Sequence, residues 1–151
     1  MTTRSRSLVS EDWCRTHQLK NRESLNQTNL MRIAIDCDDA GLALKQVIVE
    51  HLRAQGVEAV DLDLLGQRRT DYPDIGHHLA KKVAAKEFDR GILICGTGLG
   101  MAMVANKVPG VFAGTCHDTF SAERLKKSND ANVLTLGSRV IGPELAKMIV
   151  S

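Results

Sequence analysis

The sequence predicts an α/β domain whose sheet is parallel and covered by helices on both faces. Short apolar runs alternate with segments in which apolar residues recur at helical spacing, the pattern of repeated strand–helix–strand units. The run GILIC, which ends at Cys95, is continuously apolar, as expected of a strand buried on both faces. With 151 residues, 43% of them hydrophobic and 25% charged, the chain is long enough for one domain with a core.

The first half of the predicted domain contains two strands and two helices. Strands are predicted at 31–36 (MRIAID) and 57–63 (VEAVDLD). The helix between them ends before Gly56, and its apolar face is formed by Leu44, Val47, Ile48 and Leu52. A loop rich in Gln and Arg then leads through TDYP to a second helix, whose apolar face is formed by Ile75, Leu79 and Val83.

The second half repeats the alternation around a glycine-rich turn. A third strand at 90–95 (RGILIC) is followed by a helix that opens with GLGMAMVANK; the later elements are a strand at 111–116, a helix at 119–127, a strand at 132–137 and a helix with Pro143 in its first turn. Because such crossovers are right-handed, the five strands are expected to form the parallel sheet of a Rossmann-like three-layer αβα sandwich.

Composition argues against several classes of function for this protein. The formal net charge of +2 arises within residues 1–30, because residues 31–151 contain fifteen basic and fifteen acidic side chains; this balance predicts no nucleic-acid groove. No apolar run reaches the roughly 18 to 20 residues of a membrane span, and no secretory signal is present, so we expect a cytoplasmic protein without membrane association. The cysteines show neither disulfide nor zinc-ligand spacing, which predicts reduced thiols at Cys14, Cys37, Cys95 and Cys116.

The chain divides into two parts in the sequence. Residues 1–30 are rich in Ser, Thr, Asn, Gln and Arg without a sustained period, and we expect a disordered or extraneous N-terminal extension. Residues 31–151 form the predicted folded domain. Ligands of parallel α/β sheets bind beyond the carboxyl ends of the strands. Four polar clusters fall at those ends: 36–39, 95–100, 117–118 and 138–139.

The glycine-rich turn GTGLG contains the strongest candidate for chemistry. Backbone N–H groups between a strand and a helix can face an anion, although the spacing matches neither GxGxxG nor a P-loop, so a turn without a ligand stays an alternative. Such donors and the start of a helix make a thiol a usable base, whereas a lone strand cysteine is more often inert packing. Thr97 can aim a hydroxyl at the same point as Cys95, which pairs a base with an oxyanion donor.

Four segments carry a resemblance to a known family. MRIAIDCDDAG, TDYPDIGHHLA, GILICGTGLGMAMVANKVPG and SNDANVLTLGSRVIGPELAKMIV, in this order and at these separations, resemble the ribose-5-phosphate isomerase B family, which includes the galactose-6-phosphate isomerase subunits. The resemblance covers 31–150. It implies an enzyme that interconverts an aldose phosphate and a ketose phosphate through a cis-enediolate, without a cofactor, as a homodimer or homotetramer with shared sites.

The resemblance also implies residue roles. Cys95 would remove the proton from the carbon next to the carbonyl, while Thr97 and the N–H groups of the turn would stabilise the enediolate; Asn129 and Arg139 would reach the substrate from a neighbouring subunit. The implied site comprises Cys95 and Thr97 as catalytic residues and Asp38, Asp39, Tyr72, Gly96, Gly98, Leu99, Gly100, Asn129 and Arg139 as substrate-binding residues. Simpler roles stay open: helix capping for Asp38, a turn for Asn129, a surface ion pair for Arg139 and packing for Tyr72.

Three departures from the family pattern bear on the substrate. Ser128 stands where the family's ribose isomerases have the histidine assigned to ring opening, and Asp39 stands where a histidine helps at the phosphate end. The chain ends at Ser151, where the family continues into a helix with arginines, so we expect a domain that lacks this helix, exposes Leu145, Ile149 and Val150, and is less stable or monomeric.

The histidine that is missing at position 128 suggests a tetrose phosphate, because a tetrose 4-phosphate has its O4 blocked and needs no ring opening. His117 could also approach the pocket and protonate a ring oxygen, but a solvated loop position is the expectation. His77 and His78 are adjacent on a helix and point about 100° apart, so no metal pair is predicted. The alternative to an isomerase is a non-catalytic sugar-phosphate binding protein or an inactive truncated homologue.

Overall fold

The computed structural model describes residues 30–67 and 70–151, and a compact unit spans Met31–Ser151. The predicted N-terminal extension at 1–30 lies outside the described residues except for Leu30. In chain order the elements are β1 (Arg32–Cys37), the 3-10 helix η1 (Asp39–Gly41), α2 (Leu42–Ala54), β2 (Glu58–Asp61), α3 (Leu64–Gln67), α4 (Tyr72–Ala84), β3 (Arg90–Cys95), α5 (Leu99–Ala105), β4 (Ala113–Thr115), α6 (Thr119–Lys127), β5 (Val133–Gly137) and α7 (Pro143–Val150).

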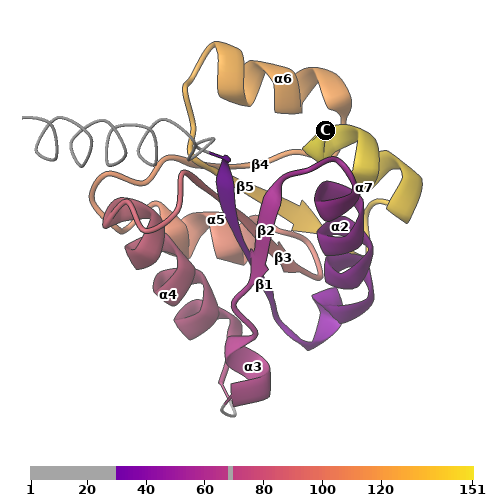
Figure 1. Cartoon of the computed structure of the whole chain (residues 1–151). Coiled ribbons are helices and arrows are strands. Elements are labelled where there is room, and N and C mark those ends of the chain that lie inside the picture. The colour runs from indigo at the N-terminus through magenta and orange to yellow at the C-terminus, as the bar shows by residue number, and fades with distance from the viewer. Residues whose placement is uncertain (1–29, 68–69) are drawn as a thin grey trace, which may run out of the picture. The chain divides into compact units, whose positions relative to one another are not determined.

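The sheet is parallel throughout and has the strand order β2-β1-β3-β5-β4, which confirms the predicted five-stranded sheet (Figure 1). The strands that end in the polar clusters are neighbours. Cys37 pairs with Ile94 between β1 and β3, and Cys95 pairs with Gly137 between β3 and β5. The register therefore brings the clusters after these three strands to one edge of the sheet.

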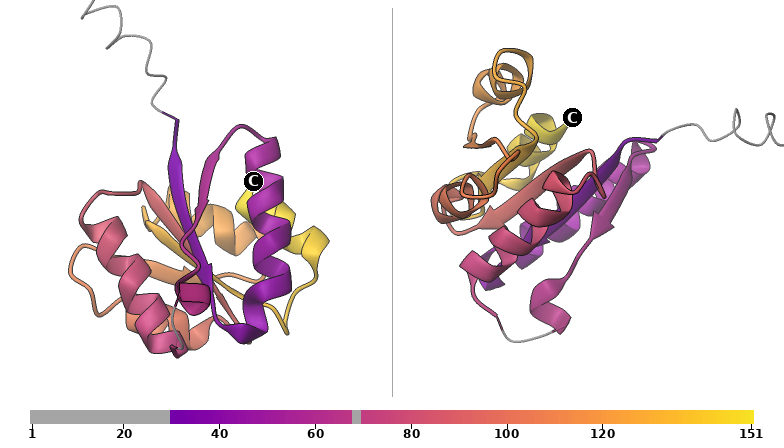
Figure 2. Two further views of the ribbon diagram at one scale, coloured as in Figure 1. Left: turned by 60° about the horizontal axis from the view of Figure 1, so that its bottom comes forward. Right: turned by 90° about the vertical axis from the view of Figure 1, so that its left-hand side faces the viewer.

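Two hydrophobic clusters separate the layers. On one face the strands pack against α2 and α7 through residues such as Ile48 and Ala146, and on the other against α4 and α5 through residues such as Leu79 and Met101. Figure 2 shows the sheet between these helices. The three-layer αβα sandwich is thus confirmed, and the strands of the centre are buried on both faces, as the apolar run before Cys95 predicts.

Local signals explain where the helices begin. The carboxylate of Asp118 accepts the N–H of Ser121 at 2.7 Å and caps α6, while Pro73 follows the extended Asp71 at the start of α4. Gly98 precedes α5 with φ of 80°, a left-handed conformation that glycine adopts without a steric penalty. These signals fix the loops at the carboxyl edge of the sheet.

Several boundaries differ from the sequence prediction. The strand expected at 57–63 is shorter, and the Gln/Arg loop after it contains the four-residue helix α3. β2 is an edge strand whose single neighbour is β1, and its register covers Glu58 to Asp61. The last helix is a full eight residues long, and the prediction of an exposed Ile149 is wrong: this side chain is buried against the α2 face of the sheet, while Leu145 and Val150 are half-buried.

Candidate active site

The topological switch point of the sheet lies between β1 and β3. The connection from β1 leads to β2 on one side, and the connection from β3 leads to β4 on the other, so the connections leave this point in opposite directions. Loops diverge at such a point and leave room for a small ligand. The predicted residues at 38–39 and 95–100 follow these two strands, and the N–H of Asp38 donates to the carbonyl of Ile94 at 3.2 Å, which ties the two loops together.

Cys95 is the last residue of β3, and its thiol is held by the glycine turn. The side chain is buried, and its Sγ accepts the N–H of Gly98 at 3.1 Å. Gly98 can lie this close because it has no side chain: a Cβ there would come within 3.0 Å of the carbonyl carbon of Leu136.

Thr97 sits beside this thiol on the exposed side of the turn. Its hydroxyl oxygen accepts the N–H of Leu99 at a long 3.4 Å, so the hydroxyl is only weakly engaged within the turn. The turn packs closely against the end of β5: a Cβ on Gly137 would lie only 2.8 Å from the carbonyl of Thr97. The thiol of Cys95 and the hydroxyl of Thr97 are thus presented by one loop with a rigid support.

Arg139 lies over the same loop of its own chain. Its N–H donates to the carbonyl of Gly96 at 3.1 Å, and its side-chain Cδ lies 3.5 Å from the position of a Cβ on Gly96. Arg139 thus lies beside the loop of Cys95 in its own chain, because β5 ends next to β3 in one sheet; its approach from a neighbouring subunit stays a prediction. Ser138, which sequence reasoning left without a role, donates its hydroxyl to the carbonyls of Ala40 at 2.7 Å and Cys95 at 3.2 Å.

The two aspartates after β1 differ in their surroundings. The carboxylate of Asp38 accepts the N–H of Ala40 at 3.0 Å and caps η1, so the simpler capping role is present. Burial raises the pKa of Asp38, and Arg139 acts in the opposite direction, which places the guanidinium near this carboxylate. Asp39 is exposed, and its negative charge also raises the pKa of Asp38.

Tyr72 reaches the site from the first turn of α4. A Cβ on Gly100 would lie 2.7 Å from the Tyr72 ring, so the phenol rests directly on the glycine turn. The ring is 42% exposed, and Leu99 beside it is 54% exposed. The structure therefore brings Tyr72, Leu99 and Gly100 together at the glycine turn.

Ser128 and Asn129 lie elsewhere. They follow α6, which returns from the carboxyl edge of the sheet to its amino edge, and Asp130 next to them interacts with Arg90 at the start of β3. Cys95 is at the opposite end of that six-residue strand, about 17 Å away at the usual rise per residue. One chain does not bring Asn129 to Cys95.

His117 is not the solvated loop residue that was expected. Its ring is half-buried, and its Nε2 accepts the N–H of Gly137 at 3.0 Å. This nitrogen is therefore engaged and cannot deliver a proton to a sugar ring oxygen. The prediction fails because the sequence does not show that β4 ends early and leaves the N–H of Gly137 for a side chain.

A buried charged network next to the site was also missed. The carboxylate of Asp36 is fully buried and accepts the N–H groups of Cys37 at 2.9 Å and Leu64 at 3.3 Å; burial raises its pKa to about 6. The ammonium of Lys45, only 2% exposed, binds Asp61 at 2.8 Å. The sequence signal for this network is Asp36, an acidic residue within an otherwise apolar strand.

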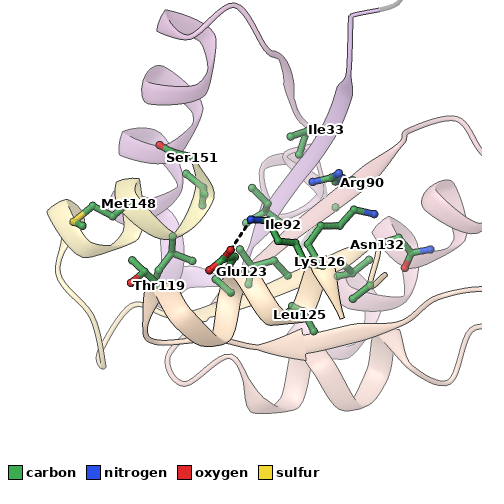
Figure 3. A pocket seen from close by; sticks show the side chains of 18 residues that line it. Ile33, Arg90, Ile92, Thr119, Glu123, Leu125, Lys126, Asn132, Met148 and Ser151 are labelled. Atoms are coloured by element: carbon green, nitrogen blue, oxygen red, sulfur yellow. Dashed lines mark hydrogen bonds and ion pairs between the residues drawn. The ribbon is translucent and has the colours of Figure 1, made fainter. Parts of the chain in front are cut away.

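A hollow of the described surface is separate from these residues. A groove of about 310 Å³ lies between α6, α7 and the amino half of the sheet, with Ile92, Leu134 and Ile149 among its lining residues (Figure 3). At its rim Glu123 binds Lys127. None of the predicted site residues lines this groove, so volume alone does not locate the chemistry.

Other features of the described residues bear on ligands. No group of three or more His, Cys, Asp or Glu side chains suited to a metal ion occurs in residues 30–67 and 70–151. Within the same residues no helix is long and apolar enough to cross a bilayer. His77, of the adjacent histidine pair, faces solvent on α4.

A parallel α/β sheet that gathers a thiol, a hydroxyl and backbone donors at its switch point has the arrangement of an acid–base enzyme acting on a small molecule. The chain belongs to the ribose/galactose isomerase family, whose model matches residues 33–151, and it is an isomerase. It is 49% identical over 121 residues to the ribose-5-phosphate isomerase B of Escherichia coli K12, covering 80% of this chain and 81% of that protein.

Two further relatives differ in their substrates. The D-erythrulose-4-phosphate isomerase of Pectobacterium atrosepticum is 48% identical over 123 residues, with 80% of each chain covered. The crystal structure of ribose-5-phosphate isomerase B from Mycoplasma genitalium with bound ribulose-5-phosphate has a TM-score of 0.72 and 40% identity, again with 80% of each chain covered. The family thus includes relatives named for a pentose phosphate and for a tetrose phosphate.

Proposed function

We propose that this protein interconverts an aldose phosphate and a ketose phosphate, with Cys95 as the base. The observation that carries the proposal is the Cys95 thiol at the end of β3, which accepts the N–H of Gly98 at 3.1 Å beside the hydroxyl of Thr97. The relatives above are all named as isomerases, which does not favour a non-catalytic binding protein. The expectation that no cofactor is needed stays a prediction, as does the cytoplasmic location.

The reaction is a proton transfer between neighbouring carbons. The thiolate of Cys95 removes the proton from C2 of the open-chain aldose, and the electron pair moves to the carbonyl oxygen on C1 to give an enediolate. Thr97 and the turn N–H groups hold this developing negative charge. The thiol returns a proton to C1, and the proton of the C2 hydroxyl passes to the oxygen on C1, so C2 becomes the ketose carbonyl and no atom is gained or lost overall.

The remaining predicted residues orient the substrate in this proposal. Asp38 accepts hydrogen bonds from sugar hydroxyls, Tyr72 and Leu99 line the site, and Arg139 supplies a positive charge next to Gly96. Asp39 is exposed on the loop after β1, and a carboxylate repels a phosphate dianion. We therefore place the phosphate next to Arg139, on the loop after β5.

We propose a tetrose 4-phosphate as the preferred substrate. Ser128 lacks a titratable ring, and the Nε2 of His117 already accepts the N–H of Gly137. A tetrose 4-phosphate cannot close a furanose through its phosphorylated O4, so an enzyme without a ring-opening acid can act on it. A relative with 48% identity is named for D-erythrulose 4-phosphate, which agrees with this choice.

The site is proposed to be completed by a second copy of the chain. Asn129 lies at the amino edge of its own sheet, so it can reach a substrate at Cys95 only from a neighbouring subunit. Large apolar side chains are exposed on α5 (Leu99 and Met103), before β4 (Phe112) and at the start of α6 (Phe120), each between 54% and 70% exposed. Such a surface is suited to contact between subunits.

Proton NMR in D₂O tests the reaction and its substrate together. With D-erythrose 4-phosphate we expect deuterium to enter the carbon next to the carbonyl, with slower incorporation into ribose 5-phosphate, and the Cys95→Ala variant is expected to show neither. The matched control is Cys37→Ala, which removes a buried thiol from the α2 face. Exchange with ribose 5-phosphate and none with the tetrose would contradict the substrate, and exchange that survives Cys95→Ala would contradict the base.

A further inference from the structure

His117 holds the end of β5, which is the support of the catalytic loop. β4 pairs with β5 only as far as Thr115, opposite Thr135. Two residues further along β5, the N–H of Gly137 donates to His117 Nε2 at 3.0 Å. A side chain therefore takes the place that a strand carbonyl fills elsewhere in a parallel ladder.

Gly137 in turn contacts the catalytic loop closely. It pairs with Cys95 in the sheet, and a Cβ on Gly137 would lie 2.8 Å from the carbonyl of Thr97 and 2.9 Å from His117 Nε2. The next N–H, that of Ser138, donates to the carbonyl of Cys95 at 2.8 Å. A displacement of Gly137 would thus move both the thiol and the hydroxyl of the proposed site.

The hydrogen bond fixes the protonation state of the ring. A backbone N–H can only donate, so Nε2 must be unprotonated, and the neutral ring carries its proton on Nδ1. When the ring takes up a second proton, Nε2 becomes a donor that faces another donor. The bond is then lost, and the two N–H groups repel each other.

From this geometry we infer that His117 is a positioning residue, whose neutral imidazole keeps Gly137 and the loop of Cys95 and Thr97 in place for catalysis. The inference rests on the proposed isomerase function. His117 touches no substrate in this scheme and acts through Gly137. It makes activity depend on the protonation of a histidine that is not the base.

The surroundings contain other titratable and charged groups. Asp118 follows His117 and caps α6, and its hydrogen bonds with Ser121 lower the pKa of this carboxyl. Cys116 precedes His117 and is buried, Cys95 lies opposite Gly137, and the guanidinium of Arg139 follows on the loop after β5. The test must therefore separate the effect of the His117 acceptor from that of these neighbouring groups.

Two substitutions make this separation. In His117→Gln the side-chain amide oxygen can accept the N–H of Gly137 and does not titrate, whereas His117→Ala removes the acceptor. We expect His117→Ala to lower kcat by about ten- to a hundredfold with little change in KM, because the loop that stabilises the transition state is displaced. His117→Gln is expected to keep kcat within about threefold of wild type at pH 8.

The comparison of the two variants is the decisive readout. A loss of kcat in His117→Ala with KM unchanged, and its recovery in His117→Gln, is expected of a residue that acts through the acceptor for the N–H of Gly137. His51→Gln, at the amino edge of the sheet, is the matched control and is expected to keep the wild-type kcat. Wild-type kcat in His117→Ala, or a kcat in His117→Gln as low as that of His117→Ala, would overturn the inference.

An observation without activity separates this inference from the proposed function. In the ¹⁵N NMR spectrum of wild-type protein at pH 8, His117 is expected to show a protonated Nδ1 and an unprotonated Nε2. A ring protonated at Nε2 would overturn the positioning role whatever the enzyme does. Absence of isotope exchange in wild type, together with the expected tautomer, would instead contradict the proposed function.

Discussion

At the scale of single residues, the cysteines differ in their neighbours rather than in their burial. Cys37, Cys95 and Cys116 are the cysteines of the described residues, and all three are buried. Burial raises the pKa of Cys37 to about 12 and also raises that of Cys116, so both thiols stay protonated at neutral pH. The Sγ of Cys95 accepts a backbone N–H at the start of α5, which suits it to the role of base.

Asp36 provides a prediction of pH-dependent stability. Its pKa is raised from 3.8 to about 6 by burial, which outweighs the two N–H donors and the charge of Lys45. Because the folded state binds the proton more tightly than the unfolded chain, the contribution of Asp36 to stability is full below pH 3.8 and is lost as the pH rises through about 6. The whole loss is about 3 kcal/mol, roughly half of it between pH 5 and pH 7.5.

Urea unfolding of wild type and Asp36→Asn at pH 5 and pH 7.5 measures this effect. We expect wild type to lose more stability than the variant over this interval, by about 1 to 1.5 kcal/mol. Glu50→Gln removes an exposed carboxylate from α2 and is expected to behave like wild type. An identical pH dependence in wild type and Asp36→Asn would show that the buried carboxyl is not the titrating group.

The sequence indicates which residues carry chemistry better than it indicates how they are held. Parallel pairing brings Asp38, Cys95 and Arg139 to one edge of the sheet, and this follows from the alternation of strands and helices, whereas the order of the strands does not. The contacts of His117 and Ser138 could not be predicted, because they depend on where β4 ends and on how closely the loops approach. Both side chains bind backbone N–H or carbonyl groups, and these groups are the same in nearly every residue, so the sequence does not identify the partners.

At the scale of elements, long periodic segments were predicted closely and short ones were not. The expected helix at 119–127 coincides with α6, and the strand at 90–95 coincides with β3. The four-residue helix α3 was missed, because so short a helix shows no apolar period. The extent of the last helix was underestimated, although its proline start was predicted.

The turn between β3 and α5 yields a prediction with an internal control. Gly98 and Gly56 both have φ of 80°, but a Cβ on Gly98 would meet Leu136 and Thr115 at 3.0 Å, whereas nothing lies within 4 Å at Gly56. We expect Gly56→Ala to cost only the backbone strain of about 1 kcal/mol and to keep full activity. Gly98→Ala is expected to cost at least about 1 kcal/mol more and to lower kcat at least about tenfold.

Urea unfolding and the isomerase assay measure the two effects separately. The extra loss in Gly98→Ala follows from displacement of the N–H that Cys95 accepts, so the loss of kcat should persist at temperatures where the variant is fully folded. Equal stability and equal activity of the two variants would mean that the close contact of Gly98 with β5 has no role in catalysis.

At the scale of the whole molecule, α6 is a helix that its own chain leaves largely uncovered. It has no buried residue, and Phe120 on it is 70% exposed. It also carries Asn129 to the edge of the sheet opposite Cys95. These two properties are expected of a helix that packs against a second copy and supplies its last residues to that copy's site, and light scattering is expected to give at least a dimer.

Subunit complementation tests whether sites are shared. Cys95→Ala and Asn129→Ala are each expected to be at least about tenfold less active than wild type. In a dimer that contains one chain of each kind, one site receives both wild-type residues and the other receives neither. Random association at equal amounts makes half of the dimers mixed, each with one intact site of two, so activity should recover to about a quarter of the wild-type value.

The recovery must come from mixed oligomers. Refolding the two variants together and confirming mixed dimers by native mass spectrometry provides the sample, and the same variants refolded separately and then combined provide the control. If Asn129 acted on the Cys95 of its own chain, every site of a mixed dimer would carry one substitution, and activity would stay at the average of the two variants. Mixed dimers at that level would contradict the shared site and leave Asn129 as a turn residue after α6.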